Sequence, residues 1–176
     1  SVHEIENWDD LRRRLQPDDR RCFAFFHPAM PDEPLIFVEV ALTKGTPNSI
    51  QSVLLENRDA MAAEKADTAA FYSISNCQAG LAGISFGNSL IKTVVQHLLR
   101  ELPQIRNFVT LSPIPGLVKW LRETGNFDAD ATAETHMQLA AHYLLNAKHH
   151  RGQPHDPVAR FHLNNGALVG AVHANA

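Results

Sequence analysis

The clearest pattern along the chain is an apolar stripe of helical period between residues 87 and 100. The apolar positions recur at i, i+1, i+4, i+5, i+8 and i+9, and are Leu90, Ile91, Val94, Val95, Leu98 and Leu99. The opposite face carries Lys92, Gln96, His97 and Arg100. Because apolar residues on one face of a 3.6-residue period mark a helix with one buried side, this segment predicts an amphipathic helix.

Other segments favour strands, because β-branched and aromatic residues dominate them. The predicted strands are residues 21–27, 35–42, 69–75, 107–111, 159–163 and, at the end of the chain, 166–176. The first two are expected to form a hairpin around a proline-rich turn at 28–34. Shorter helices are predicted at 9–15 and, from a weaker pattern, around 137–144.

Two further segments have less distinct patterns. Residues 49–55 fit either a short helix or a strand, and both alternatives stay open. Residues 59–66 are polar and alanine-rich, and we expect them to be exposed.

The order of elements over residues 69–111 is strand, glycine-containing loop, helix and strand. This order predicts a β-loop-α-β unit, and hence an α/β fold with helices flanking a central sheet. With 176 residues, the chain is long enough for a single domain with a substantial core.

Composition narrows the functional classes. The chain is 44% hydrophobic and 20% charged, which is typical of a folded globular protein. It has no apolar run of roughly 20 residues, so we expect no membrane span. The net charge of -3 argues against nucleic acid or an anionic membrane as a partner. The only cysteines are Cys22 and Cys77, and the first residues do not resemble a signal peptide, so we expect a cytoplasmic protein.

A glycine loop, residues 80–88, precedes the predicted amphipathic helix. The free N–H groups and the dipole of a helix start attract anions, and glycine lets the backbone approach them closely. The loop therefore suits a phosphate or pyrophosphate. The alternative, a tight turn in which glycine only supplies positive φ, stays open.

The same loop contains Gly83-Ile84-Ser85-Phe86-Gly87, a G-x-S-x-G pattern typical of the nucleophile elbow of α/β-hydrolases. Asp156 and His162 follow it in the order that such a triad requires. The predicted strand, however, ends several residues before Ser85, and no glycine-rich oxyanion segment precedes it. We therefore consider the hydrolase alternative weaker.

Two further residues are candidates for chemistry. Ser112 follows a predicted strand, in the position where α/β sheets place reactive groups, although a turn or N-cap serine would look the same. His162 has apolar neighbours, which fits either a tuned acid/base or a hydrogen-bonded core residue. His149, His150 and His155 lie in a polar segment without the cysteines or carboxylates that would complete a recognisable metal site, so we expect no metal.

Taken together, several motifs resemble the catalytic region of the malonyl-CoA decarboxylases. The similarity covers nearly the whole chain, and no single motif would be sufficient for it. The most specific segments are Leu111-Ser112-Pro113-Ile114-Pro115-Gly116 and Asp156-Pro157-Val158-Ala159-Arg160-Phe161-His162-Leu163. The others are residues 21–28, 33–43, 71–75 and 80–87.

The resemblance implies a GNAT acyltransferase fold, in which a mixed sheet splays between two central strands. It implies a single catalytic domain over residues 1–176, without the family's N-terminal helical domain, which assembles oligomers, and without the C-terminal end. By resemblance, Ser112 and His162 are the catalytic pair. The loop that would hold the CoA pyrophosphate is Ala82, Gly83, Ile84, Ser85, Phe86, Gly87 and Asn88.

The reaction implied is decarboxylation of malonyl-CoA to acetyl-CoA and CO2 through a thioester enolate. Ser112 would orient the carboxylate, and His162 would protonate the α-carbon. Backbone N–H groups of Ile74, Ser75 and Asn76 would bind the thioester oxygen. No cofactor beyond the CoA of the substrate is expected. The alternatives are an acyl-CoA N-acyltransferase and a CoA-binding module without catalysis.

Overall fold

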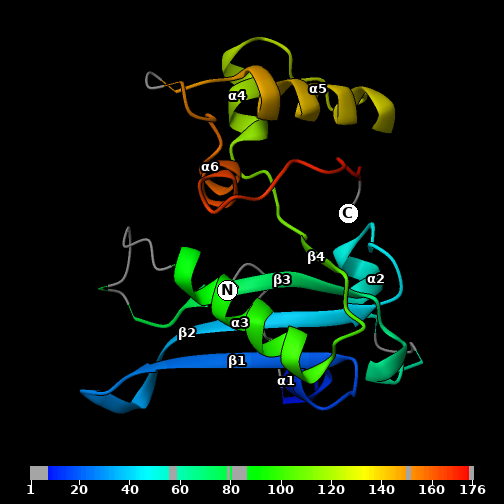
Figure 1. The fold of residues 1–176 in the computed structure, drawn as a ribbon. Coiled ribbons are helices and arrows are strands. Elements are labelled where there is room, and N and C mark those ends of the chain that lie inside the picture. Colours follow the sequence, from blue (N-terminus) through cyan, green and yellow to red (C-terminus); the bar gives the residue numbers. More distant parts are fainter. Residues whose placement is uncertain (1–7, 56–58, 79, 81–86, 150–151, 175–176) are drawn as a thin grey trace. The chain divides into compact units, whose positions relative to one another are not determined.

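The computed structural model describes residues 8–55, 59–78, 80, 87–149 and 152–174. Its chain divides into two compact units, Ser1–Leu111 and Ser112–Ala176. Figure 1 shows the strands in the first unit and only helices and loops in the described part of the second. Each unit is considered by itself below.

A four-stranded mixed sheet organises the first unit, with strand order β1-β2-β3-β4. Its strands are β1 (Arg20–His27), β2 (Met30–Thr43), β3 (Thr68–Asn76) and β4 (Asn107–Thr110). β2 is antiparallel to both β1 and β3, whereas β4 is parallel to β3. The predicted hairpin and α/β fold class are therefore confirmed.

Helix α3 (Gly87–Glu101) joins the two parallel strands, so the predicted β-loop-α-β unit is also confirmed. Its apolar stripe covers one face of the sheet, where Val94 and Leu98 are buried with Val38, Val40 and Phe71. Packing of this kind is what fixes an amphipathic helix on a sheet.

The other side of the sheet has a smaller apolar cluster, in which Ala41 and Tyr72 are buried with Val53 of α2 (Ile50–Leu54). The segment 49–55, whose sequence fits either a helix or a strand, thus contains the helix α2, which Ser49 caps by accepting from the Ser52 N–H. Helix α1 (Trp8–Leu15) confirms the prediction at 9–15 and places Arg14 against Glu39 of β2.

β4 accompanies only the first part of β3. Their register runs from Thr68↔Asn107 to Phe71↔Thr110, while β3 continues to Asn76. β3 therefore extends five residues beyond its register with β4, and the expected splay of the sheet stays a prediction.

Two predictions in the first unit were wrong. Residues 28–34 are not all turn, because β2 already begins at Met30 and Pro34 pairs with Phe26 across a register irregularity. Residues 59–66 are not uniformly exposed, because Ala63 and Ala66 are buried around the 3-10 turn η1 (Ala63–Lys65). Alanine is small enough to bury in a polar segment whose average composition suggests exposure.

The second unit contains α4 (Leu117–Glu123), α5 (Ala133–Asn146) and α6 (Pro157–Asn164). α5 confirms the weakly patterned helix around 137–144. The predicted strand at 159–163 was wrong, since these residues lie within α6. Asp156 caps this helix and Pro157 occupies its first turn, and these start signals outweigh the β-like alternation of the residues that follow.

The predicted strand at 166–176 was wrong as well. Residues 166–174, the part of this segment that the structure describes, have no strand structure and pair with none of the described strands. Leu168 is 91% exposed there, so the segment also lacks the buried face that stabilises a strand.

Candidate active site

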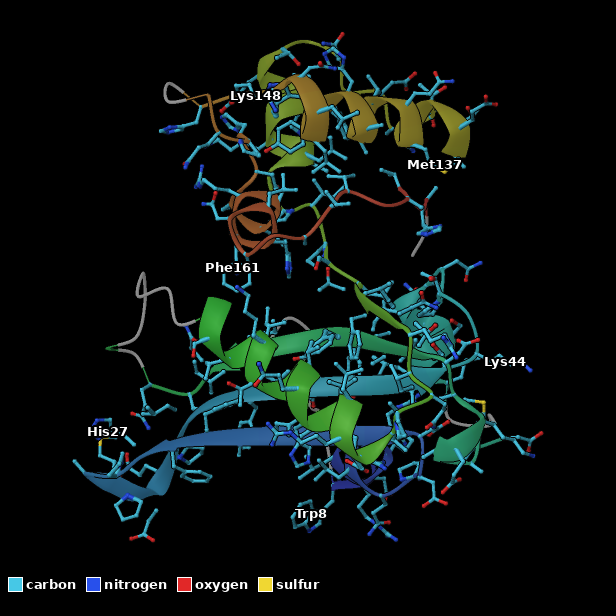
Figure 2. All side chains as sticks on the ribbon, viewed as in Figure 1. Trp8, His27, Lys44, Met137, Lys148 and Phe161 are labelled. Carbon is cyan, nitrogen blue, oxygen red and sulfur yellow. The ribbon has the colours of Figure 1, made fainter. Side chains whose placement is uncertain are left out.

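A serine and a histidine form the centre of the candidate site. Ser112 Oγ and His162 Nε2 lie 2.9 Å apart, within hydrogen-bond distance. Ser112 is exposed on the loop that follows β4, and His162 is half-buried in the last turn of α6. Phe161, the neighbour of His162 on that helix, is labelled in Figure 2. The two residues singled out in the sequence are thus brought together.

The loop that carries Ser112 is fixed at its other end by Asp156. The Oδ2 atom of Asp156 accepts from the Gly116 N–H at 3.1 Å. Its Oδ1 atom accepts from the N–H groups of Val158 and Ala159, at 2.9 and 3.0 Å. One carboxylate therefore caps the helix of His162 and also binds the loop of Ser112.

Gly116 lies against a buried aromatic side chain. A β-carbon at this position would overlap the hydroxyl oxygen of Tyr143, a fully buried residue of α5. That hydroxyl shares a hydrogen bond of 3.1 Å with Nδ1 of His155, and the Trp120 ring lies 5.1 Å from the Tyr143 ring, centroid to centroid. Burial raises the pKa of Tyr143, which keeps the phenol protonated.

The protonation state of His162 follows from its surroundings. Burial lowers the pKa of its imidazole below the ordinary value of 6.5, because a low-dielectric environment disfavours the charged form. At neutral pH the free chain therefore holds mostly neutral imidazole. In that form Nε2 either accepts the Ser112 O–H or donates to Ser112 Oγ, depending on the tautomer.

The pair can move protons in either direction. An imidazole that accepts the serine O–H can withdraw a proton from it, and an imidazolium beside the serine can donate one to a basic carbon or oxygen. A half-buried position also strengthens its electrostatic interactions relative to those in water. The geometry is therefore that of an acid/base pair.

The other predicted site residues lie in the first unit. Ile74, Ser75 and Asn76 are the last residues of β3, beyond its pairing with β4. Gly87 and Asn88 begin α3, as expected for a helix start that follows the glycine loop. Ala82, Gly83, Ile84, Ser85 and Phe86 lie outside the described residues.

The hydrolase triad gains no support from the described geometry. Asp156 directs its carboxylate to three backbone N–H groups, and the imidazole of His162 bonds to Ser112. The proposed nucleophile, Ser85, lies outside the described residues. The elements of this motif that can be located therefore have other partners.

Across the described ranges, no group of three or more His, Cys, Asp or Glu side chains is placed to hold a metal ion. None of the helices in those ranges has the length and apolar character that crossing a membrane requires.

Comparison with known proteins decides the family. The family model for the C-terminal domain of malonyl-CoA decarboxylase matches residues 1–137 and 123–174. The chain belongs to the malonyl-CoA decarboxylase family. The mitochondrial malonyl-CoA decarboxylase of the goose Anser anser anser is 42% identical to it, over 95% of this chain and 42% of the goose protein.

Solved structures agree with this placement. A crystal structure of malonyl-CoA decarboxylase from Rhodopseudomonas palustris is 55% identical, with a TM-score of 0.82 over 95% of this chain and 47% of that one. The loading GNATL domain of CurA from Lyngbya majuscula shares the fold, with a TM-score of 0.58 at 16% identity over 93% of this chain and 71% of that one. The expected GNAT-like fold is therefore confirmed. The chain spans less than half the length of the curated malonyl-CoA decarboxylases it matches.

The chain also differs from its relatives internally. The goose alignment extends over 214 residues, whereas this chain has 176, so at least 38 aligned positions have no counterpart here. The two family-model matches overlap at residues 123–137, from the end of α4 into the first turns of α5. Here this connection is short and closed locally, with the Asn126 N–H donating to Leu121 O and Arg122 lying over the Phe127 ring.

Proposed function

We propose that this chain catalyses the decarboxylation of malonyl-CoA to acetyl-CoA and CO2, with Ser112 and His162 as the catalytic residues. The observation that carries the proposal is the 2.9 Å contact between Ser112 Oγ and His162 Nε2. It places a hydrogen-bond donor and a proton carrier together in a chain of the malonyl-CoA decarboxylase family.

The first step breaks the bond between the α-carbon and the carboxylate of malonyl-CoA. CO2 leaves, and the electron pair of that bond remains on the α-carbon, delocalised into the thioester carbonyl as an enolate. Ser112 donates a hydrogen bond that orients the departing carboxylate. The orientation accelerates the step by keeping the breaking C–C bond parallel to the π-orbitals of the thioester carbonyl, into which its electron pair moves.

The second step protonates the enolate. His162 donates a proton to the α-carbon, which gives the acetyl group, and the imidazole recovers a proton from solvent. Burial disfavours the imidazolium in the free chain, whereas the negative charge of a bound malonyl group favours it. His162 would therefore take up a proton from solvent when the substrate binds and transfer it to the α-carbon when the product forms.

Recognition of the CoA part is assigned to the first unit. Residues 82–88 precede and begin α3, a helix of 15 residues, whose free N–H groups and positive dipole end suit a pyrophosphate. Ala82 and Ser85 stand where many GNAT loops carry a glutamine or arginine and an additional glycine, so binding would rely on backbone N–H groups. The N–H groups of Ile74, Ser75 and Asn76 would bind the thioester oxygen.

The test is product analysis by mass spectrometry. The chain is incubated with malonyl-CoA in D2O and sampled before the substrate exchanges its own α-protons. Decarboxylation through an enolate predicts acetyl-CoA with one deuterium in the methyl group and an intact thioester. An N-acyltransferase would need an amine and release the CoA thiol, a hydrolase would release the thiol without an amine, and a binding module would leave malonyl-CoA unchanged.

Two variants test the assigned roles. His162→Asn should abolish turnover while acetyl-CoA still binds, and Ser112→Ala should reduce kcat by about 10²–10³-fold, as is usual when one preorganised donor is lost. His142→Asn serves as a matched control, because His142 is exposed on α5 and bonds to Asn146. Turnover that is equal in His162→Asn and the control would refute the assignment.

A further inference from the structure

We propose that Asp156 is a positioning residue whose buried carboxylate holds the Ser112 loop against the start of α6, and so sets the contact between Ser112 and His162. This role rests on the proposed function, because it concerns the same pair. Asp156 itself has no described contact with the imidazole, so it acts through the backbone.

The first support is the burial of the carboxylate together with its complete set of partners. Asp156 is 1% exposed, and a carboxylate removed from water is costly unless hydrogen bonds replace its hydration. Three backbone N–H groups do so here, two from α6 and one from Gly116. A helix cap needs only the first two, so the third bond serves the connection to the loop.

The second support is the stiffness of both connected segments. Between Ser112 and Gly116 the chain reads Pro113-Ile114-Pro115, and each proline fixes its own φ and restricts the residue before it. On the other side, His162 lies on the regular helix that Asp156 caps. Because little freedom remains on either side, anchoring Gly116 to the start of α6 restricts Ser112 Oγ relative to His162 Nε2.

The third support is the packing behind Gly116. The Tyr143 hydroxyl occupies the space that a side chain at Gly116 would need, so the loop backbone fits between Asp156 and Tyr143. The hydroxyl is held in turn by His155, the residue just before Asp156. The loop is therefore confined from two sides by residues of the second unit.

The experiment compares two substitutions that keep the helix cap. In Asp156→Asn, Oδ1 can still accept from Val158 and Ala159, but the amide NH2 would face the Gly116 N–H, donor against donor. In Asp156→Ser, the hydroxyl can cap the helix but does not reach Gly116. Thr132→Ala is the control, because Thr132 caps α5 in the same way without a bond to the Ser112 loop.

Two readouts are measured on the full chain. In steady-state assays with malonyl-CoA, both Asp156 variants should lower kcat by about 10-fold or more, since a small misplacement can cost about 10²-fold, with little change in KM. NMR titration should show the imidazole pKa of His162 rising towards its ordinary value, because a released loop lets water reach the ring. Thr132→Ala should lower the melting temperature and leave both readouts unchanged.

The outcomes separate this proposal from the proposed function. If folded Asp156 variants keep the wild-type titration of His162, or if Thr132→Ala shifts it equally, the positioning role is wrong. If neither Asp156 variant folds, Asp156 serves the fold and the role is also wrong. If wild-type chain does not decarboxylate malonyl-CoA while the titration shifts as expected, the proposed function fails and the positioning role stands.

Discussion

The backbone of Gly116 faces the Tyr143 hydroxyl so closely that the two positions cannot both carry a side chain. A β-carbon on Gly116 would overlap the hydroxyl oxygen and lie 3.2 Å from Oδ2 of Asp156. Both neighbours are buried, and neither is the free end of a flexible side chain. The glycine is thus required for space and not for an unusual φ angle.

Gly116→Ala is therefore expected to destabilise the chain by about 1–3 kcal/mol, the usual range for overpacking a filled site. Urea unfolding measures the change. Gly170→Ala is the matched control, because a β-carbon at Gly170 meets nothing within 4 Å and its φ is not in the left-handed region. Equal stability of the two variants would contradict the packing described for Gly116.

The lowered pKa of His162 predicts a pH dependence of stability. As the pH falls below 6.5, His162 becomes protonated in the unfolded chain. In the folded chain it becomes protonated only at a lower pH, because burial lowers its pKa. The free energy of unfolding therefore falls as pH decreases through this window and the effect is complete below the folded pKa. Urea unfolding of wild type and His162→Gln between pH 5 and 7.5 should show the wild type losing more stability. Parallel curves would show that burial does not perturb this imidazole.

A buried ion pair attaches α1 to the sheet. Nη1 of Arg14 lies 3.6 Å from Oε2 of Glu39, with side-chain exposures of 3% and 8%. Arg14→Met leaves the Glu39 carboxylate buried beside an apolar side chain, and we expect a loss of about 3–5 kcal/mol. The double variant Arg14→Met/Glu39→Leu should recover most of it.

Lys119→Met provides the surface comparison for this pair. Lys119 bonds to Glu123 at 3.8 Å with 81% of its side chain exposed, so its replacement should change stability by less than about 0.5 kcal/mol. Chemical denaturation of the three variants measures the difference. A similar small effect for Arg14→Met would mean that water reaches the buried pair.

The two cysteines should react at different rates. Burial, with a smaller contribution from Glu39, raises the pKa of Cys22 to about 11, whereas Cys77 is exposed. At pH 8 only about 0.1% of Cys22 is thiolate, the reactive form. Iodoacetamide should therefore modify Cys77 first, and Cys77→Ser should leave a slowly reacting chain. Rapid labelling of Cys22 in the folded chain would contradict this expectation.

Local sequence patterns predict those helices and strands in which buried side chains recur at a regular spacing. The stripe from Leu90 to Leu99 predicts α3 because it matches the helical period, and residues 35–42 predict β2 because β-branched residues fit a sheet that is covered on both sides. The strand prediction at 159–163 was wrong for the opposite reason. Its alternation resembles a strand, but Asp156 and Pro157 determine its conformation from outside it, and this start signal was present in the sequence.

The candidate site depends on contacts that no local pattern contains. Fifty positions separate Ser112 and His162, and taken alone each is as well explained by a turn or a core role. Only the resemblance to the malonyl-CoA decarboxylases predicts that these two residues act as a pair. The bond from Asp156 to Gly116 and the contact of Gly116 with Tyr143 were not predicted, because they depend on tertiary packing between segments 40 and about 30 positions apart.

The boundary between the compact units falls immediately before Ser112. Both members of the pair, the carboxylate that ties their segments and the aromatic ring behind the loop therefore belong to one continuous stretch of sequence. A genetic crossover immediately upstream of Ser112 would therefore transfer these four residues together, with the contacts among them encoded in one segment.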